Sequence, residues 1–180
     1  MELIDNPRRR DDLKVYLPEV ADLAEVPQRP DYHAEGNALI HTSMALAALP
    51  KDADVRVIWA TVLHDIGKTS TTCLVDGVLR SYGHAKVGAD MVPDILNRCG
   101  QPELEEPVAW LVHHHQFHLA WQNLHRGEGL SRKQARFCRH PLFPLLLAVC
   151  RADAAASKGS DKCNILEKLE TLINANLSLK

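Results

Sequence analysis

The chain has 180 residues, of which 46% are hydrophobic and 24% are charged. This length and apolar content fit one compact domain with its own core, so we expect a single domain over residues 1–180. A net charge of −2 gives the chain no general attraction to nucleic acid or to an anionic membrane. Any contact with either must therefore come from a local patch.

The five cysteines are scattered along the chain and form no Cys-x-x-Cys pair. This pattern argues against a disulfide framework and against a zinc–thiolate site. The N-terminus has no apolar segment of signal-peptide length, and the longest apolar runs are shorter than a membrane span. We therefore expect a cytoplasmic protein without a membrane partner.

Apolar residues recur mostly with helical spacing, which predicts an all-α helical bundle with few strands. The first clear helix covers residues 38–49 and carries His41 in its first turn. Asp54 can cap the next helix, and Gly67 supplies a stop signal for it. The pair His64-Asp65 then lies at the C-terminal end of that helix.

A loop follows, with a small hairpin near residues 73–80, because an Asp-Gly pair separates two short apolar runs. The next helix opens at His84 and ends before Gly100. Residues 102–115 form another helix, which begins at a proline.

The segment 117–129 has a mixed composition that predicts an irregular connection. A Ser-x-x-Gln capping box at residues 131–134 then opens a short helix. A buried helix over residues 142–156 carries Asp153, and an amphipathic helix from Asp161 through Ile173 completes the predicted elements.

The pair His64-Asp65 is the most informative feature, because it follows a strongly apolar stretch. A buried carboxylate costs several kcal/mol unless it is paired or bound to a metal. Asp153 follows a similar run, although Arg151 could pair with one of the two aspartates. Imidazole and carboxylate together favour manganese, iron, cobalt, nickel or zinc over magnesium and calcium. The alternative for each histidine is a hydrogen-bonded structural role.

The order of these residues resembles the HD superfamily of metal-dependent phosphohydrolases. It is especially similar to the HD region behind the catalytic head of some bacterial tRNA nucleotidyltransferases. The resemblance spans most of the chain and is carried by Val26-Pro27-Gln28, His33-Ala34-Glu35-Gly36-Asn37, His41-Thr42, His64-Asp65-Ile66-Gly67-Lys68, Tyr82-Gly83-His84, Val87-Gly88-Ala89 and Arg151-Ala152-Asp153. The nucleotidyltransferase head motif is absent, so we expect a stand-alone HD domain and no CCA addition.

The resemblance implies two divalent ions, with a single ion as the alternative. The residues that it assigns to the primary site are His41, His64, Asp65 and Asp153. Asp65 would bridge to the second ion, which His84 and one or two residues of the run His113-His114-His115 would bind. Register favours His115, with His114 next, while His113 could simply be solvated.

A pair of ions can activate water for in-line attack on phosphorus, so no side-chain nucleophile is needed. In this hypothesis Asp65 and Lys68 are catalytic, and Lys68 contacts a phosphate oxygen. The alternative for Lys68 is a solvated lysine at a helix end. His33 and Glu35 could contact the substrate or assist the leaving group, whose acid is not assigned.

Basic residues also recur between residues 132 and 139. On a helix Arg132, Arg136 and Arg139 form one stripe, which could bind an RNA backbone or a polyphosphate. A solvated basic face is the alternative. The earlier run Arg8-Arg9-Arg10 has aspartates on both sides, and neither run is a strong DNA-binding signal.

From these residues we expect a hydrolase of phosphomonoester or phosphodiester bonds in nucleotides or RNA ends, 2′,3′-cyclic phosphates included. One alternative is a non-catalytic HD module that binds RNA or a nucleotide. Another is a nucleotidase or a hydrolase of the guanosine-tetraphosphate type. The sequence predicts neither the oligomeric state nor the natural substrate.

Overall fold

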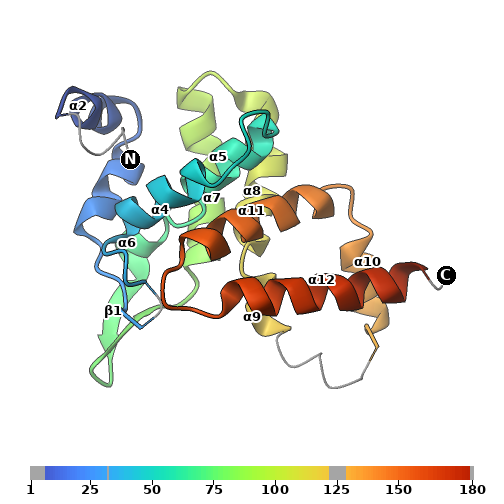
Figure 1. Ribbon diagram of the computed structural model, residues 1–180. Helices are drawn as coiled ribbons and strands as arrows, with labels where there is room; N and C mark the ends of the chain where they lie inside the picture. The colour runs from blue at the N-terminus through green and yellow to red at the C-terminus, as the bar shows by residue number, and fades with distance from the viewer. Residues whose placement is uncertain (1–6, 32, 122–128, 179–180) are drawn as a thin grey trace.

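The computed structural model describes residues 7–31, 33–121 and 129–178, and it confirms an all-α bundle (Figure 1). The helices of the N-terminal half are α2 (Pro7–Tyr16), α3 (Pro18–Ala21), η1 (Asp22–Glu25), α4 (Ala38–Ala47), α5 (Val55–Leu63) and α6 (Lys68–Thr71). The later helices are α7 (His84–Arg98), η2 (Pro102–Leu104), α8 (Glu105–His114), α9 (Phe117–Ala120), α10 (Arg132–Cys138), α11 (Phe143–Ala156) and α12 (Lys162–Ser178). None of the helices in these ranges combines the length and apolarity that a membrane span requires.

Helix α11 is the central element of the bundle, because it packs against α4, α5, α8 and α12. Its apolar side chains Leu146 and Val149 join Leu63 of α5 and Leu111 of α8 in one buried core. Helix α8 also packs along α7. Helices α4, α5, α7, α8 and α11 are thus joined by direct contacts or through a shared neighbour.

The predicted hairpin is confirmed by β1 (Thr72–Val75) and β2 (Val78–Ser81), which pair antiparallel with Val75 opposite Val78. The two turn residues, Asp76 and Gly77, have φ angles of 51° and 75°. Positive φ at both positions is the requirement of a tight type I′ turn, which the Asp-Gly pair satisfies. The hairpin projects from the helical bundle (Figure 1).

Two of the predicted helix caps are confirmed. The Asp54 carboxylate accepts a hydrogen bond from the Arg56 N–H at 2.9 Å. Ser131 and Gln134 form the reciprocal capping box that opens α10.

Gly67 has a different role from the predicted helix stop. Helix α5 already ends at Leu63, and Gly67 keeps right-handed backbone angles as the residue before α6. A Cβ at Gly67 would lie 2.2 Å from the His84 carbonyl oxygen and 2.6 Å from the Gly88 nitrogen. Glycine here allows the start of α7 to approach the turn that follows Asp65.

Several short elements were not predicted. Helices α2, α3 and η1 precede the first predicted helix, and α9 lies inside the segment predicted to be irregular. The middle of that segment, residues 122–128, lies outside the described residues.

Candidate metal centre

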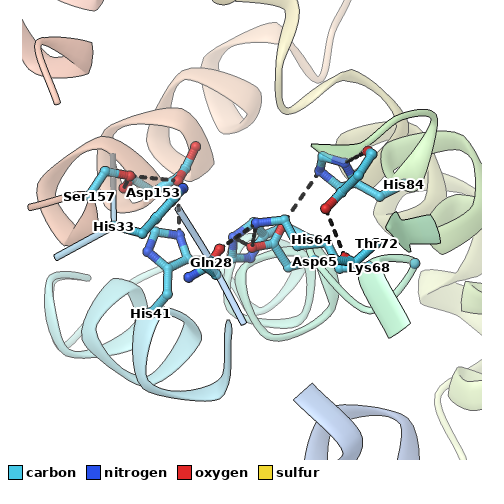
Figure 2. A network of polar contacts seen from close by, with 12 residues as sticks. Gln28, His33, His41, His64, Asp65, Lys68, Thr72, His84, Asp153 and Ser157 are labelled. Atoms are coloured by element: carbon cyan, nitrogen blue, oxygen red, sulfur yellow. Dashed lines mark hydrogen bonds and ion pairs between the residues drawn. The ribbon is translucent and has the colours of Figure 1, made fainter. Parts of the chain in front are cut away.

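Six side chains from distant parts of the chain meet at the ends of the central helices. Figure 2 labels His41, His64, Asp65, His84 and Asp153 among them. The six side chains form two groups, and within each group the potential ligand atoms lie within 4.8 Å of one another. Group one consists of His41, His64 and Asp153, and group two consists of Asp65, His84 and His115. In Figure 2, His41 and Asp153 lie on one side of the His64-Asp65 pair and His84 lies on the other. All six side chains are buried.

Helix ends position these side chains. His41 lies in the first turn of α4, and His84 is the first residue of α7. His64 and His115 are the residues that follow the last turns of α5 and α8. A side chain at a helix end can reach into the space between helices. Side chains from α4, α7 and α11, and from the residues that follow α5 and α8, therefore meet in one place.

Three of these histidines are held in the same way. In His64, His84 and His115, Nδ1 donates to the main-chain carbonyl of the residue three positions earlier, at 2.8, 2.7 and 2.7 Å. A carbonyl oxygen can only accept, and a neutral imidazole carries one N–H group. The Nε2 atom of each ring therefore presents a lone pair.

With these tautomers, none of the three lone pairs meets a hydrogen-bond donor among the described residues. Nε2 of His84 lies 3.3 Å from Nε2 of His115. Nε2 of His64 has no hydrogen-bond partner among the described residues, although this side chain is only 1% exposed. Buried acceptors without donors are unfavourable, and a divalent cation is the partner that such an arrangement fits.

Asp65 lies between the two groups. Its Oδ2 is 3.3 Å from Nε2 of His64, and its Oδ1 is 3.3 Å from Nε2 of His84. Nε2 of His115 is 4.0 Å from the same Oδ1. Burial raises the pKa of Asp65, but positive charge on His64, when that ring is protonated, and on Lys68 outweighs burial and holds the pKa well below its usual value. The two carboxylate oxygens thus face different groups.

Lys68 reaches the same carboxylate from the next turn. Its Nζ lies 2.7 Å from Asp65 Oδ2 and donates to Gln28 Oε1 at 2.7 Å. The Lys68 residue is only 8% exposed. It is therefore not a freely solvated lysine at a helix end.

His41 contacts carboxylates on both sides of its ring. Nδ1 is 2.8 Å from Glu35 Oε1, and Nε2 is 3.0 Å from Asp153 Oδ1. Burial lowers the pKa of His41, but these two carboxylates outweigh it and raise the pKa to about 9. The same Glu35 oxygen contacts Nδ1 of His33 at 2.7 Å.

Glu35 thus lies behind His41. Its side chain is fully buried, and Oε2 accepts from the main-chain N–H of Lys158 at 3.1 Å. Burial raises the pKa of Glu35, but His41 and His33 outweigh it and lower the pKa to about 2. The sequence had suggested that Glu35 contacts the substrate or assists the leaving group. The geometry fits a residue that orients His41 better than either of these roles. His33 does line the adjoining cavity.

Asp153 has a partner that the sequence did not indicate. Lys162 Nζ lies 3.1 Å from Asp153 Oδ1 and donates to Ser157 Oγ at 2.8 Å. Arg151 pairs instead with Glu170 of α12. Burial raises the pKa of Asp153, whereas Lys162 and His41 hold it well below its usual value.

His114 does not join either group. Successive residues of an α-helix are about 100° apart around its axis, and on α8 this turns His114 toward the aromatic side chains beside the helix. The His114 ring packs edge to face on Trp110 and Phe137, with distances of 4.6 and 5.0 Å between the ring centres. Burial lowers the pKa of His114 to about 4. His113 is exposed.

Arg132 and Arg136 do not join the site either. Both are exposed on α10, which packs near the end of α12 where Asn176 accepts from the Leu130 N–H. The candidate ligands lie by the other end of α12, at Lys162. With a rise of about 1.5 Å per residue, some 20 Å of helix separates the two ends.

Comparison with known proteins places most of the chain in one family. The family described as "HD domain" matches residues 31–157. A multifunctional CCA protein of Alkalilimnicola ehrlichii is 36% identical over 153 residues, which cover 79% of this chain and 35% of that protein. The protein of the same name from a Neisseria meningitidis serogroup C strain is 37% identical over 148 residues, with shares of 78% and 34%. The chain thus spans about a third of the length of these relatives.

Proposed function

This chain belongs to the HD domain family of metal-dependent phosphohydrolases, and on that premise we propose that it hydrolyses phosphate esters of nucleotides or RNA ends. The bonds would be phosphomonoesters or phosphodiesters, 2′,3′-cyclic phosphates included. The similarity to multifunctional CCA proteins supports an RNA end as one of the two substrate classes. We keep the cytoplasm as the expected compartment.

The observation that carries this proposal is the set of buried Nε2 lone pairs around Asp65. It supports two divalent ions, one held by group one and one by group two, with Asp65 shared between them. Imidazole and carboxylate ligands favour manganese, iron, cobalt, nickel or zinc. Ions bound there would supply Lewis acidity, lowering the pKa of a water molecule and offsetting charge on the phosphoryl oxygens.

The side chains around the groups have separate tasks in this mechanism. Asp65 would supply one oxygen toward His64 and the other toward His84, so it could bind metal in both groups. Glu35 fixes the orientation of the His41 ring through its contact with Nδ1. Lys68 brings a positive charge to the cavity beside the centre, where it would hold a non-bridging phosphate oxygen. Burial of all six ligand candidates limits the access of bulk water.

The test is metal analysis of the purified protein, followed by assays with manganese, cobalt and nickel on a panel of phosphomonoesters and phosphodiesters. We expect two ions per chain and hydrolysis of at least one nucleotide or RNA-end substrate. The matched control is Asp90→Ala, which removes an exposed carboxylate from α7 and should change neither result. Metal binding without hydrolysis of any ester would favour the non-catalytic binding module.

A further inference from the structure

A cavity of about 490 Å³ adjoins the candidate metal centre. Lys68 and His84, which contact Asp65, are among its lining residues. The hairpin strand β2 forms one wall, and α9 with the start of α12 forms another. This volume lies in the range of sites that hold ligands larger than phosphate itself.

The charge of the lining favours an anion. Among the described residues that line the cavity, four are cationic, namely Arg29, Lys68, Arg80 and Lys162, and Asp161 is the one carboxylate. Arg29, Lys68 and Lys162 each lie within 3.1 Å of a carboxylate oxygen, those of Asp31, Asp65 and Asp153. Arg80 has no carboxylate partner among the described residues, so an anionic ligand would supply one, and its guanidinium lies 5.9 Å from the centre of the Tyr82 ring. Lys68 and Lys162 flank the metal centre itself.

The other part of the lining is apolar. Leu79 of β2, Leu119 of α9 and Ile165 of α12 line the cavity. Tyr82 also lines it and is 68% exposed, so much of its side chain is accessible to a ligand. Neither a bare phosphate nor a polyphosphate has a group that would cover these surfaces.

We propose that this cavity binds the nucleoside of a phosphate ester, with the base stacked on Tyr82 and the phosphate directed toward Lys68 and the metal centre. A nucleotide combines negative charge with a flat, largely apolar ring, as the lining requires. Stacking on an aromatic side chain accepts any base, because every base has a π face. Arg80 on the same tyrosine strengthens the stack.

This inference rests on the proposed function for the orientation of the phosphate, but its test does not depend on turnover. The probes are the 3′- and 5′-methylenephosphonate analogues of AMP, which resist hydrolysis, and the matching ribose phosphonates without a base. Calorimetry on the metal-loaded protein measures their dissociation constants. The proteins compared are the parent, Tyr82→Ala, Tyr82→Phe and Tyr16→Ala.

We expect at least one nucleotide analogue to bind more tightly than its base-free partner. Tyr82→Ala should weaken nucleotide binding by about tenfold and leave the ribose phosphonate unchanged, whereas Tyr82→Phe should keep most of the affinity. Tyr16→Ala is the matched control, because Tyr16 is also 68% exposed but lies on α2, outside the cavity lining. Metal content should be equal in all four proteins.

Equal affinities for nucleotide and base-free analogues in the parent protein would overturn the inference. So would a Tyr82→Ala effect of equal size on both ligands. Tyr82-dependent binding without hydrolysis of any ester would support the inference and reject the proposed function. The ligand could be a free nucleotide or the end of an RNA, and a trinucleotide ending in the same phosphonate separates the two. If it binds more tightly than the AMP analogue, the cavity takes an RNA end, and if it binds more weakly, the cavity takes a free nucleotide.

Discussion

The two groups of potential ligands share Asp65 as a neighbour but differ in what lies behind their histidines. In group one, His41 is backed by the Glu35 carboxylate and contacts Asp153. His64 of group one and both histidines of group two, His84 and His115, are backed only by main-chain carbonyls. A carboxylate behind a histidine raises its basicity as a ligand, so group one should bind its ion more tightly.

The largest effect is expected from Asp65→Ala, because it removes the carboxylate that faces both groups. Loss of several kcal/mol of transition-state stabilisation corresponds to a decrease of roughly a thousandfold or more in kcat/KM. Metal content should fall as well. Steady-state kinetics and elemental analysis provide the two measurements, and normal values of both would remove Asp65 from the centre.

His84→Ala and His115→Ala separate the groups. Each should lose the ion of group two and retain that of group one, since His41, His64 and Asp153 are untouched. We expect one ion per chain and a loss of activity of about two orders of magnitude. His114→Ala is the control and should keep two ions, because its ring packs on Trp110. The reverse pattern for His114 and His115 would contradict the geometry.

Lys68→Ala tests whether Lys68, whose Nζ contacts Asp65 Oδ2, also binds the phosphate of the substrate. Loss of one charge-assisted contact costs about 1.5–3 kcal/mol, or one to two orders of magnitude in kcat/KM. Metal content should stay unchanged, and Lys68→Arg should recover part of the loss. Parent-like hydrolysis by Lys68→Ala would mean that the phosphate is held elsewhere.

Glu35→Gln tests the expected difference in metal affinity between the two groups, and its effect should be the smallest of the four. Removal of a hydrogen-bonding partner behind a metal ligand typically lowers affinity 10- to 100-fold, and glutamine keeps an acceptor oxygen. We therefore expect weakening of about tenfold for the tighter ion and no change for the weaker one, measured by chelator competition. If only KM changed, at constant metal affinity, Glu35 would be a substrate contact.

Local features of the fold were readable from the sequence because they depend on neighbouring residues. The Asp54 cap, the capping box of α10 and the Asp-Gly hairpin are examples, and all three are confirmed. Helix periodicity likewise placed His41 and His84 at helix starts. These positions decide which side chains can reach the interior.

Features that depend on tertiary contacts were not readable. Lys162 approaches Asp153 only because the chain turns back after α11, and no spacing rule indicates that contact. The close approach at Gly67 requires the position of α7. Register favoured His115 over His114 without excluding the latter, and only the orientation of α8 puts His114 against Trp110 and outside both groups.

Each of the two aspartates carries an ammonium group of its own: Lys68 lies 2.7 Å from Asp65, and Lys162 lies 3.1 Å from Asp153. Unpaired, these buried carboxylates would oppose folding by several kcal/mol each. With the lysines in place, both carboxylates have a counter-ion before any metal binds, so a metal ion would replace an ammonium group within an already folded chain. Which metal occupies the centre would then follow the supply of each metal as much as the preference of the ligands.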